Sequence, residues 1–165
     1  MPEQETIKRA QLDEAEGKAS TTQAGEFVRK EMHHIRRGKH GARSTKQAIA
    51  IGLSKARRAG VPLKPPARGK KKTRESAARA YRAGQSRRPR RTSATRSRAV
   101  SGALKRENRS AAGPGPSPVQ ARSAARRRTS AQRSSAARRA ARTKGPAARS
   151  AAARKAGRTR ARRRR

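Results

Sequence analysis

Lysine and arginine are the residues of this chain whose type and number could do chemistry, and that chemistry is the binding of polyanions. The 165 residues include 48 Lys and Arg against nine Asp and Glu, for a formal net charge of +39 at pH 7. Nucleic acid is the commonest dense polyanion in a cell, and release of its condensed counterions favours binding without sequence recognition. Arginine outnumbers lysine, and its planar guanidinium suits forked contacts to phosphate and insertion into a minor groove.

The charge is unevenly distributed along the chain. Seven of the nine acidic residues lie in the first 31 residues, which carry a net charge of −2, so the remainder carries +41. Residues 64–165 contain 35 bases and only two acids, Glu75 and Glu107. Full neutralisation of this region would engage the phosphates of roughly 16 base pairs, at two phosphates per pair. The basic region is therefore predicted to carry the affinity for nucleic acid.

The candidate phosphate contacts fall into two groups. The first belongs to a helical segment and the second to the basic tail that follows it. They are Arg43, Lys46, Lys55, Arg57 and Arg58 in the segment, and Lys70, Lys71, Lys72, Arg87, Arg88, Arg90, Arg91, Arg126, Arg127, Arg128, Arg138, Arg139, Arg162, Arg163, Arg164 and Arg165 in the tail.

Two helices are predicted between Ser20 and Gly60. The first is capped by Ser20 with Gln23, with Thr21 or Thr22 as alternative caps, and it carries an apolar stripe and stops at Gly38. The second is capped by Ser44 with Gln47 and stops at Gly60. The stripes are Ala24, Phe27, Val28, Met32 (or Glu31) and Ile35, then Ala48, Ile49, Ile51, Leu53 and Ala56, with Gly52 leaving a flat spot for a close backbone. A hairpin of about 40 residues is small for independent stability, so a homodimer through the Ile49/Leu53 face is a further hypothesis.

The predicted fold class is all-α: a small helical hairpin over residues 20–61, a weak helix within 1–19, and a disordered tail over 62–165. Low hydrophobicity with high net charge is typical of chains that cannot offset their ordering entropy. Residues 73–84 could add two or three helical turns, and the GPGPSP stretch at 113–118 should break any helix. The Ala-rich pieces beyond it are expected to become helical on binding nucleic acid, because alanine has the highest helix propensity.

Other kinds of site find little support in the sequence. There is no cysteine, and the neighbours His33 and His34 diverge by about 100° on a helix, so neither a metal nor another cofactor is expected. No nucleophile elbow, phosphate-binding glycine loop or paired carboxylates indicate an enzyme. Phe27 and Tyr81 are the whole aromatic content, too few for stacking on single strands. A helix-turn-helix arrangement of Ser44–Arg58 is weighed, but its apolar residues are expected to face inward.

The stretch GKHGARSTKQAIAIGLSKARRAG, residues 38–60, resembles the core of a small bacterial domain family of unknown function, some of whose members are labelled DNA-binding. The resemblance extends over about residues 5–64 and implies a small domain followed by a basic tail, with no established activity. In composition alone, the tail is also similar to histone-like tails, although it is rich in Arg rather than Lys.

These observations favour a non-enzymatic, histone-like protein that binds duplex DNA with little sequence preference. The alternatives are an RNA-binding or ribosome-associated basic protein, and a protein-interaction module whose tail only localises it. No window approaches the roughly 18 apolar residues of a membrane span, and the acidic N-terminus is unlike a signal peptide. The expected location is cytoplasmic and nucleoid-associated.

Overall fold

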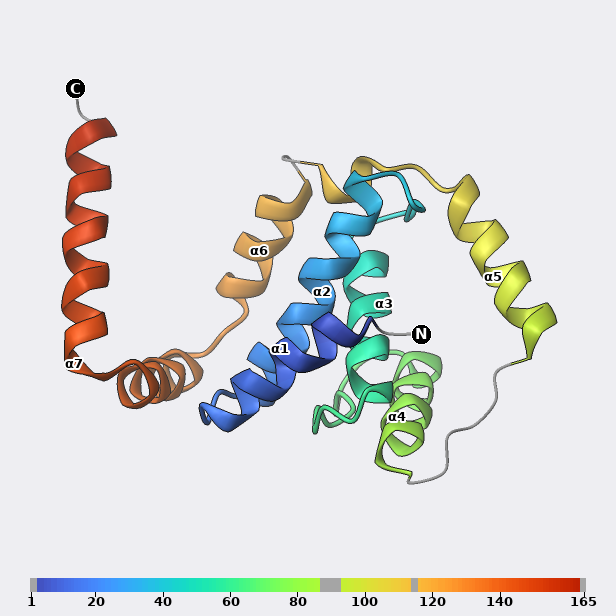
Figure 1. The fold of residues 1–165 in the computed structure, drawn as a ribbon, viewed down its shortest axis with the longest axis horizontal. Coiled ribbons are helices and arrows are strands. Elements are labelled where there is room, and N and C mark those ends of the chain that lie inside the picture. Colours follow the sequence, from blue (N-terminus) through green and yellow to red (C-terminus); the bar gives the residue numbers. More distant parts are fainter. Residues whose placement is uncertain (1–2, 87–92, 114–115, 164–165) are drawn as a thin grey trace. The chain divides into compact units, whose positions relative to one another are not determined.

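The structure is a computed structural model that describes residues 3–86, 93–113 and 116–163. In these ranges the chain is all-α (Figure 1). The helices are Gln4–Ala15 (α1), Ser20–Arg36 (α2), Thr45–Arg58 (α3), Lys71–Gln85 (α4), Ala94–Arg106 (α5), Pro116–Arg126 (α6) and Ser130–Arg163 (α7), with a 3-10 turn, η1, at Ser110–Ala112. None of these helices is both long enough and apolar enough to cross a membrane.

The chain divides into two compact units, Met1–Ala125 and Arg126–Arg165. Within the first unit the helices pack in chain order: α1 on α2, α2 on α3, and α3 on α4, while η1 contacts both α2 and α3. Figure 1 shows α2 between α1 and α3, with α4 beside α3. Among the described residues, α5 and α6 pack against no other helix. The predicted division at residues 61 and 62 falls inside the first unit.

The two predicted central helices are present, and the second is capped as predicted. The Ser44 hydroxyl accepts a hydrogen bond from the Gln47 amide at 3.2 Å, and α3 follows directly. The predicted Ser20 cap is wrong by one position, because Ala19 precedes the first turn of α2 and provides no side-chain cap. Gln23 instead donates a side-chain hydrogen bond back to the Lys18 carbonyl at 3.0 Å, which ties α2 to the preceding turn.

Two small apolar clusters form the core of the first unit. One is built on Phe27 and joins α1, α2, α3 and the segment after α3; the other is built on Ile35 and joins α2, α3 and η1. Their buried members are Ala10, Ala24, Phe27, Ala56 and Val61 in the first, and Ile35, Ala42, Ala48, Ala111 and Ala112 in the second. The predicted flat spot at Gly52 is confirmed, since a Cβ there would lie 2.7 Å from the Val28 Cα.

Residues 104–112, which we call the strap, return to the loop between α2 and α3. The amides of Gly41 and Ala42 donate to the carbonyls of Leu104 (2.8 Å) and Asn108 (2.9 Å), respectively. The Thr45 hydroxyl donates to the Ala111 carbonyl at 2.7 Å, and the Arg36 Nε donates to the Ala112 carbonyl at 2.9 Å. The strap therefore completes the second core cluster with residues that the sequence assigned to the tail.

The prediction that residues 62–165 form a disordered tail is wrong. The prediction that the ordered fold is confined to a small helical hairpin is also wrong. Helix α4 buries Ala77 and Ala80, and packs against α3. The longest helix, α7, lies at the end of the chain and is interrupted only at Gly145, where φ is 65° and ψ is 171°, just before Pro146. Low hydrophobicity limits how much a segment can bury, but it does not prevent helix formation by alanine- and arginine-rich segments with high helix propensity.

Candidate nucleic-acid interface

The basic residues predicted from the tail are exposed wherever the structure describes them. Lys70, Lys71 and Lys72 lie at the start of α4 with their side chains in solvent. The other exposed members, from the end of α6 to the end of α7, are Arg126, Arg127, Arg128, Arg138, Arg139 and Arg162. The remaining predicted contacts lie outside the described residues or side chains; these are Arg87, Arg88, Arg90, Arg91, Arg163, Arg164 and Arg165.

Helix α7 is basic and has no buried face. The unit from Arg126 to Arg165 holds 17 of the 48 Lys and Arg residues and none of the acids. No described side chain of α7 is buried. Twelve bases fall within the 34 residues of this helix. A helix rises by about 1.5 Å per residue, so α7 presents one positive charge for about every 4 Å of its length. Those charges are available to a polyanion from every side.

The five contacts predicted on the helical segment divide into exposed and engaged residues. Arg43, Lys46 and Arg58 are exposed, and the Arg43 guanidinium also lies 3.7 Å from the Glu107 carboxylate in the strap. Lys55 reaches into the first unit, where its Nζ lies 2.5 Å from Glu31 Oε2. Arg57 is only 7% exposed, and its Nε donates to the Leu63 carbonyl at 3.1 Å. Burial lowers the pKa of Arg57, but a guanidinium remains charged at neutral pH.

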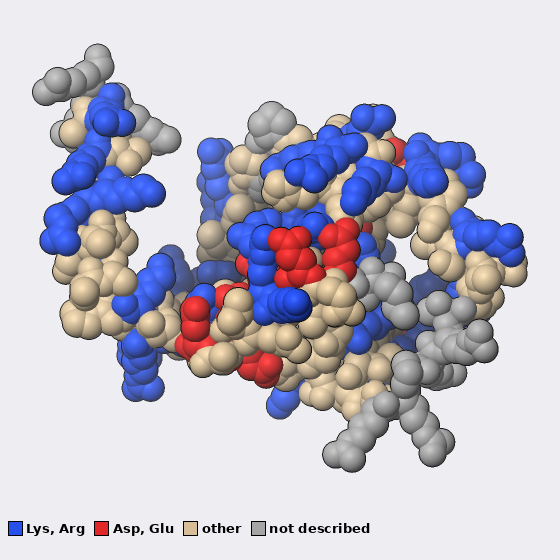
Figure 2. All heavy atoms as spheres, viewed as in Figure 1, with Lys and Arg blue, Asp and Glu red and all other residues tan. Residues whose placement is uncertain are grey.

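Six of the seven acidic residues among residues 1–31 have basic partners inside the first unit. Glu26 pairs with Arg29 and Glu5 with Arg9, each within one helix. The Lys18 ammonium lies 2.7 Å from both Asp13 and Glu16, and these two contacts raise its pKa. Figure 2 shows the visible acidic side chains in several patches, with basic side chains beside the central ones. Residues 64–165 hold 35 of the 48 bases and only two acids, so most of the excess positive charge lies beyond α3.

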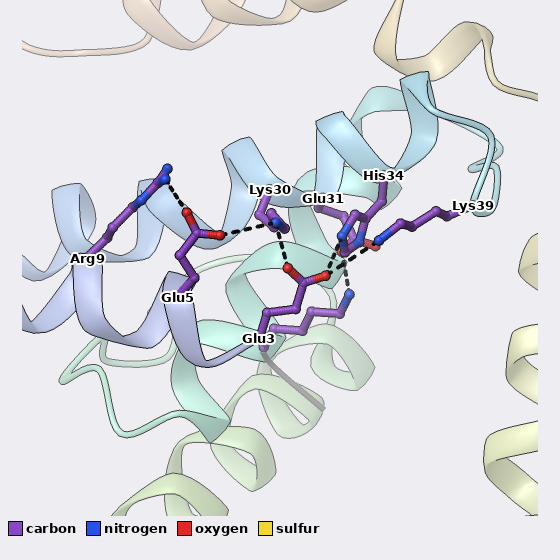
Figure 3. A network of polar contacts seen from close by, with 8 residues as sticks. Glu3, Glu5, Arg9, Lys30, Glu31, His34 and Lys39 are labelled. Carbon is purple, nitrogen blue, oxygen red and sulfur yellow. Dashed lines mark hydrogen bonds and ion pairs between the residues drawn. The ribbon is translucent and has the colours of Figure 1, made fainter.

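A polar network connects the start of α1 to α2 and to the loop that follows it (Figure 3). Glu3 accepts from Lys30 at 2.6 Å and lies 2.9 Å from His34 Nε2. The hydrogen bond from Lys30 is the main reason that the pKa of Glu3 falls to about 2. Burial lowers the pKa of His34 below its ordinary value, although the contact with Glu3 acts in the opposite direction. The network fixes the N-terminal residues against α2.

Sequence reasoning missed how the histidines are grouped. His33 and His34 do diverge, and His33 is exposed. His34, however, shares a face with Glu31, three residues earlier, and the loop after α2 brings His40 beside them. One ligand atom from each of Glu31, His34 and His40 lies within 4.8 Å of the other two. The E-x-x-H spacing on a predicted helix was the available signal, because residues at i and i+3 are neighbours on a helix surface.

The predicted homodimer surface is partly used within the chain. Leu53 packs against the cluster around Phe27, and Ile49 is half-buried. The homodimer therefore stays a prediction that needs a solution measurement.

Comparison with protein-family models, with curated proteins and with solved structures finds no match to this chain. The resemblance noted for residues 38–60 likewise stays an expectation.

Proposed function

We propose that this protein binds nucleic acid, duplex DNA in particular, with little sequence preference and without catalysis. The observation that carries the proposal is the second unit: 17 bases, no acids, and a helix with none of its described side chains buried. A helix with charge around its whole circumference has no apolar face to bury against a protein. Its favourable partner is a polymer of phosphates, which releases counterions as arginines replace them.

The geometry of α7 favours backbone contacts over base recognition. Its described side chains that could contact DNA are mainly Arg and Lys, with Gln132 and small hydroxyl residues between them. Phosphate contacts fix position on a duplex but carry no sequence information. The duplex offers one negative charge for about every 1.7 Å of its axis, so the positive charges on whichever side of α7 faces the duplex have phosphates within reach. The exposed bases of the first unit, Arg43, Lys46 and Arg58, add to the contact area.

The test is a salt series with the full chain. Binding to two unrelated duplexes is measured by fluorescence anisotropy from low to physiological salt. If about eight phosphates are engaged, log K should fall against log salt with a slope near −7, and the two duplexes should behave alike. A shallow slope, or a strong preference for one duplex, would contradict the proposal.

A charge-neutral form of α7 localises the binding. Its twelve Lys and Arg residues are replaced by Gln, which keeps helix propensity close to that of Arg but removes the charge. We expect affinity at physiological salt to fall by more than about 100-fold and the slope to flatten. The matched control replaces the same arginines by Lys and should keep the slope. Structured RNA serves as competitor; if it displaces DNA efficiently at equal phosphate concentration, the RNA-binding alternative is favoured instead.

A further inference from the structure

The group formed by Glu31, His34 and His40 lies outside the proposed nucleic-acid surface. Glu31 and His34 come from the last two turns of α2, and His40 lies two residues beyond Gly38 in the loop before α3. Their three ligand atoms lie within 4.8 Å of one another. Glu31 is 1% exposed, and the two histidine side chains are 13% and 14% exposed. This is a shielded site that solvent reaches only at its edge.

The hydrogen bonds of His40 create an unbalanced contact with Glu31. His40 Nδ1 lies 3.0 Å from the Gly41 carbonyl oxygen, which can only accept, so Nδ1 carries the proton. In the neutral ring Nε2 then holds a lone pair, and it faces Glu31 Oε1 at 3.1 Å. Two lone pairs at this distance repel unless a proton or a metal cation lies between them. Two ligands of a tetrahedral zinc ion are separated by about 3.3 Å, given bonds of ~2.0–2.1 Å.

Glu31 supplies an oxygen that the protein leaves unsatisfied. Its Oε2 accepts from Lys55 at 2.5 Å, while its Oε1 is buried and has no hydrogen bond. A buried carboxylate oxygen without a partner is unfavourable. Because Lys55 bonds to Oε2, Oε1 remains available to bind a cation as a single-oxygen ligand.

One ring nitrogen of His34 is held by a carboxylate, as in many metal-binding histidines. Its Nε2 lies 2.9 Å from Glu3 Oε1, and since a carboxylate accepts, Nε2 donates and the other ring nitrogen keeps its lone pair. Histidines that bind metals typically donate their second N–H to a carboxylate or a backbone carbonyl. His34 donates to the carboxylate of Glu3, and His40 donates to the backbone carbonyl of Gly41.

We propose that Glu31, His34 and His40 bind one divalent transition-metal ion of the zinc class. Two imidazoles and one carboxylate form a nitrogen–oxygen ligand set suited to Zn²⁺. A cavity of about 20 Å³ borders Glu31 and His34 but not His40, and it has room for a single water. The ion would join the end of α2 to the loop whose next residues, Gly41 and Ala42, hold the strap.

The surrounding lysines set the affinity. Lys30, Lys39 and Lys55 all lie in the same network, and their positive charges disfavour the binding of a metal cation nearby. Each is paired, however: the first two contact Glu3 at 2.6 and 3.7 Å, and the third contacts Glu31. We therefore expect weaker binding than in a structural site made of thiolates.

The experiment titrates the full, metal-free chain with Co²⁺, whose visible absorption reports its coordination, and then displaces it with Zn²⁺. We expect one ion per chain, a tetrahedral Co²⁺ spectrum and a rise in the melting temperature with Zn²⁺. His40→Ala should weaken Zn²⁺ binding by at least about tenfold. His33→Ala is the matched control, because it removes the adjacent but exposed imidazole, and it should bind as the parent does.

Two results would overturn the proposal. One is the absence of saturable binding at one ion per chain in a parent protein that is folded by circular dichroism. The other is equal weakening in His33→Ala and His40→Ala, which would show binding by scattered surface histidines. Nitrogen NMR of the imidazoles supplies a readout that does not depend on variants. The His40 Nε2 resonance should shift on adding Zn²⁺; an imidazolium signal that is unchanged by Zn²⁺ would show a proton in the metal's place.

Discussion

The packed part of the first unit and helix α7 both depend on alanine, in opposite ways. Among the residues whose burial the structure describes, nine of the twelve buried apolar ones are alanines, and they lie where helices α1–α4 and the strap approach one another. Helix α7 also contains twelve alanines, yet none of its described side chains is buried. In the first unit the small side chain permits close packing, whereas in α7 it contributes only its helix propensity.

An alanine-rich composition therefore supports two kinds of stability in this chain. Each buried alanine removes little apolar area from water, so the packed unit depends on its few larger side chains and on backbone contacts. Helix α7 depends on local hydrogen bonds and propensity, which tolerate changes of charge. Substitutions that test packing should therefore act on the first unit and leave α7 unaffected.

The largest effect is expected from Phe27→Ala. Phe27 is 2% exposed at the centre of the first cluster, so its removal should lower the free energy of unfolding by about 3–5 kcal/mol. Urea unfolding followed by the fluorescence of Tyr81, the only tyrosine, on packed helix α4, measures the loss. Val119 in α6 is 63% exposed, and the control Val119→Ala should change stability by less than about 0.5 kcal/mol. Similar losses in both variants would contradict a core built on Phe27.

Glycine substitutions compare the two regions directly. A Cβ on Gly41 would lie 1.8 Å from the Glu107 carbonyl oxygen, whereas a Cβ on Gly157 in α7 meets nothing within 4 Å. Gly41→Ala should therefore displace the strap and cost about 1–3 kcal/mol. Gly157→Ala should leave the unfolding midpoint of the first unit unchanged and slightly raise the helical signal in circular dichroism. An undisturbed Gly41→Ala variant would show that the strap does not dock as described.

Helix caps give a smaller effect of the same kind. Ser44 caps α3, which is packed on both α2 and α4. Ser93 caps α5 by accepting a hydrogen bond from the Arg96 amide, and α5 packs on no described helix. Ser44→Ala should cost about 1 kcal/mol in urea unfolding. Ser93→Ala should leave that transition in place, because fraying of α5 exposes no core. A loss of equal size in Ser93→Ala would mean that α5 is coupled to the packed unit.

The smallest effect concerns pH. The folded pKa of Glu3, about 2, lies below its ordinary value of 4.5, so its contribution is fully present above pH 4.5 and is lost as pH falls toward 2. The carboxylate is 38% exposed and partly screened, so the contribution should not exceed about 1 kcal/mol. Glu3→Gln should remove that share of the acid-induced loss in urea midpoints compared at pH 6 and pH 3. Glu5→Gln, at a 62% exposed carboxylate, is the control.

Local signals in the sequence predicted the local features of the fold. The stops at Gly38 and Gly60, the cap at Ser44 and the inward stripe of α2 depend on residues a few positions apart, and each is present. The packing of α4 and the strap could not be predicted in this way, because they join alanines that carry no distinctive pattern. The same holds for Lys55 and Arg57, whose internal partners, Glu31 and the Leu63 carbonyl, follow only from the packed structure.

The strap also has a consequence for the order of folding. Helices α1–α4 contact neighbours in the chain, but the strap's hydrogen bonds to Thr45 and Arg36 join residues 66 and 76 positions apart. Closing a loop of that length costs more chain entropy than bringing adjacent helices together. Docking of the strap forms four hydrogen bonds and buries two alanines, and these contacts offset that cost. Strap docking is therefore a late event in folding, and a polypeptide emerging from the ribosome completes its second core cluster only after residue 112 has been made.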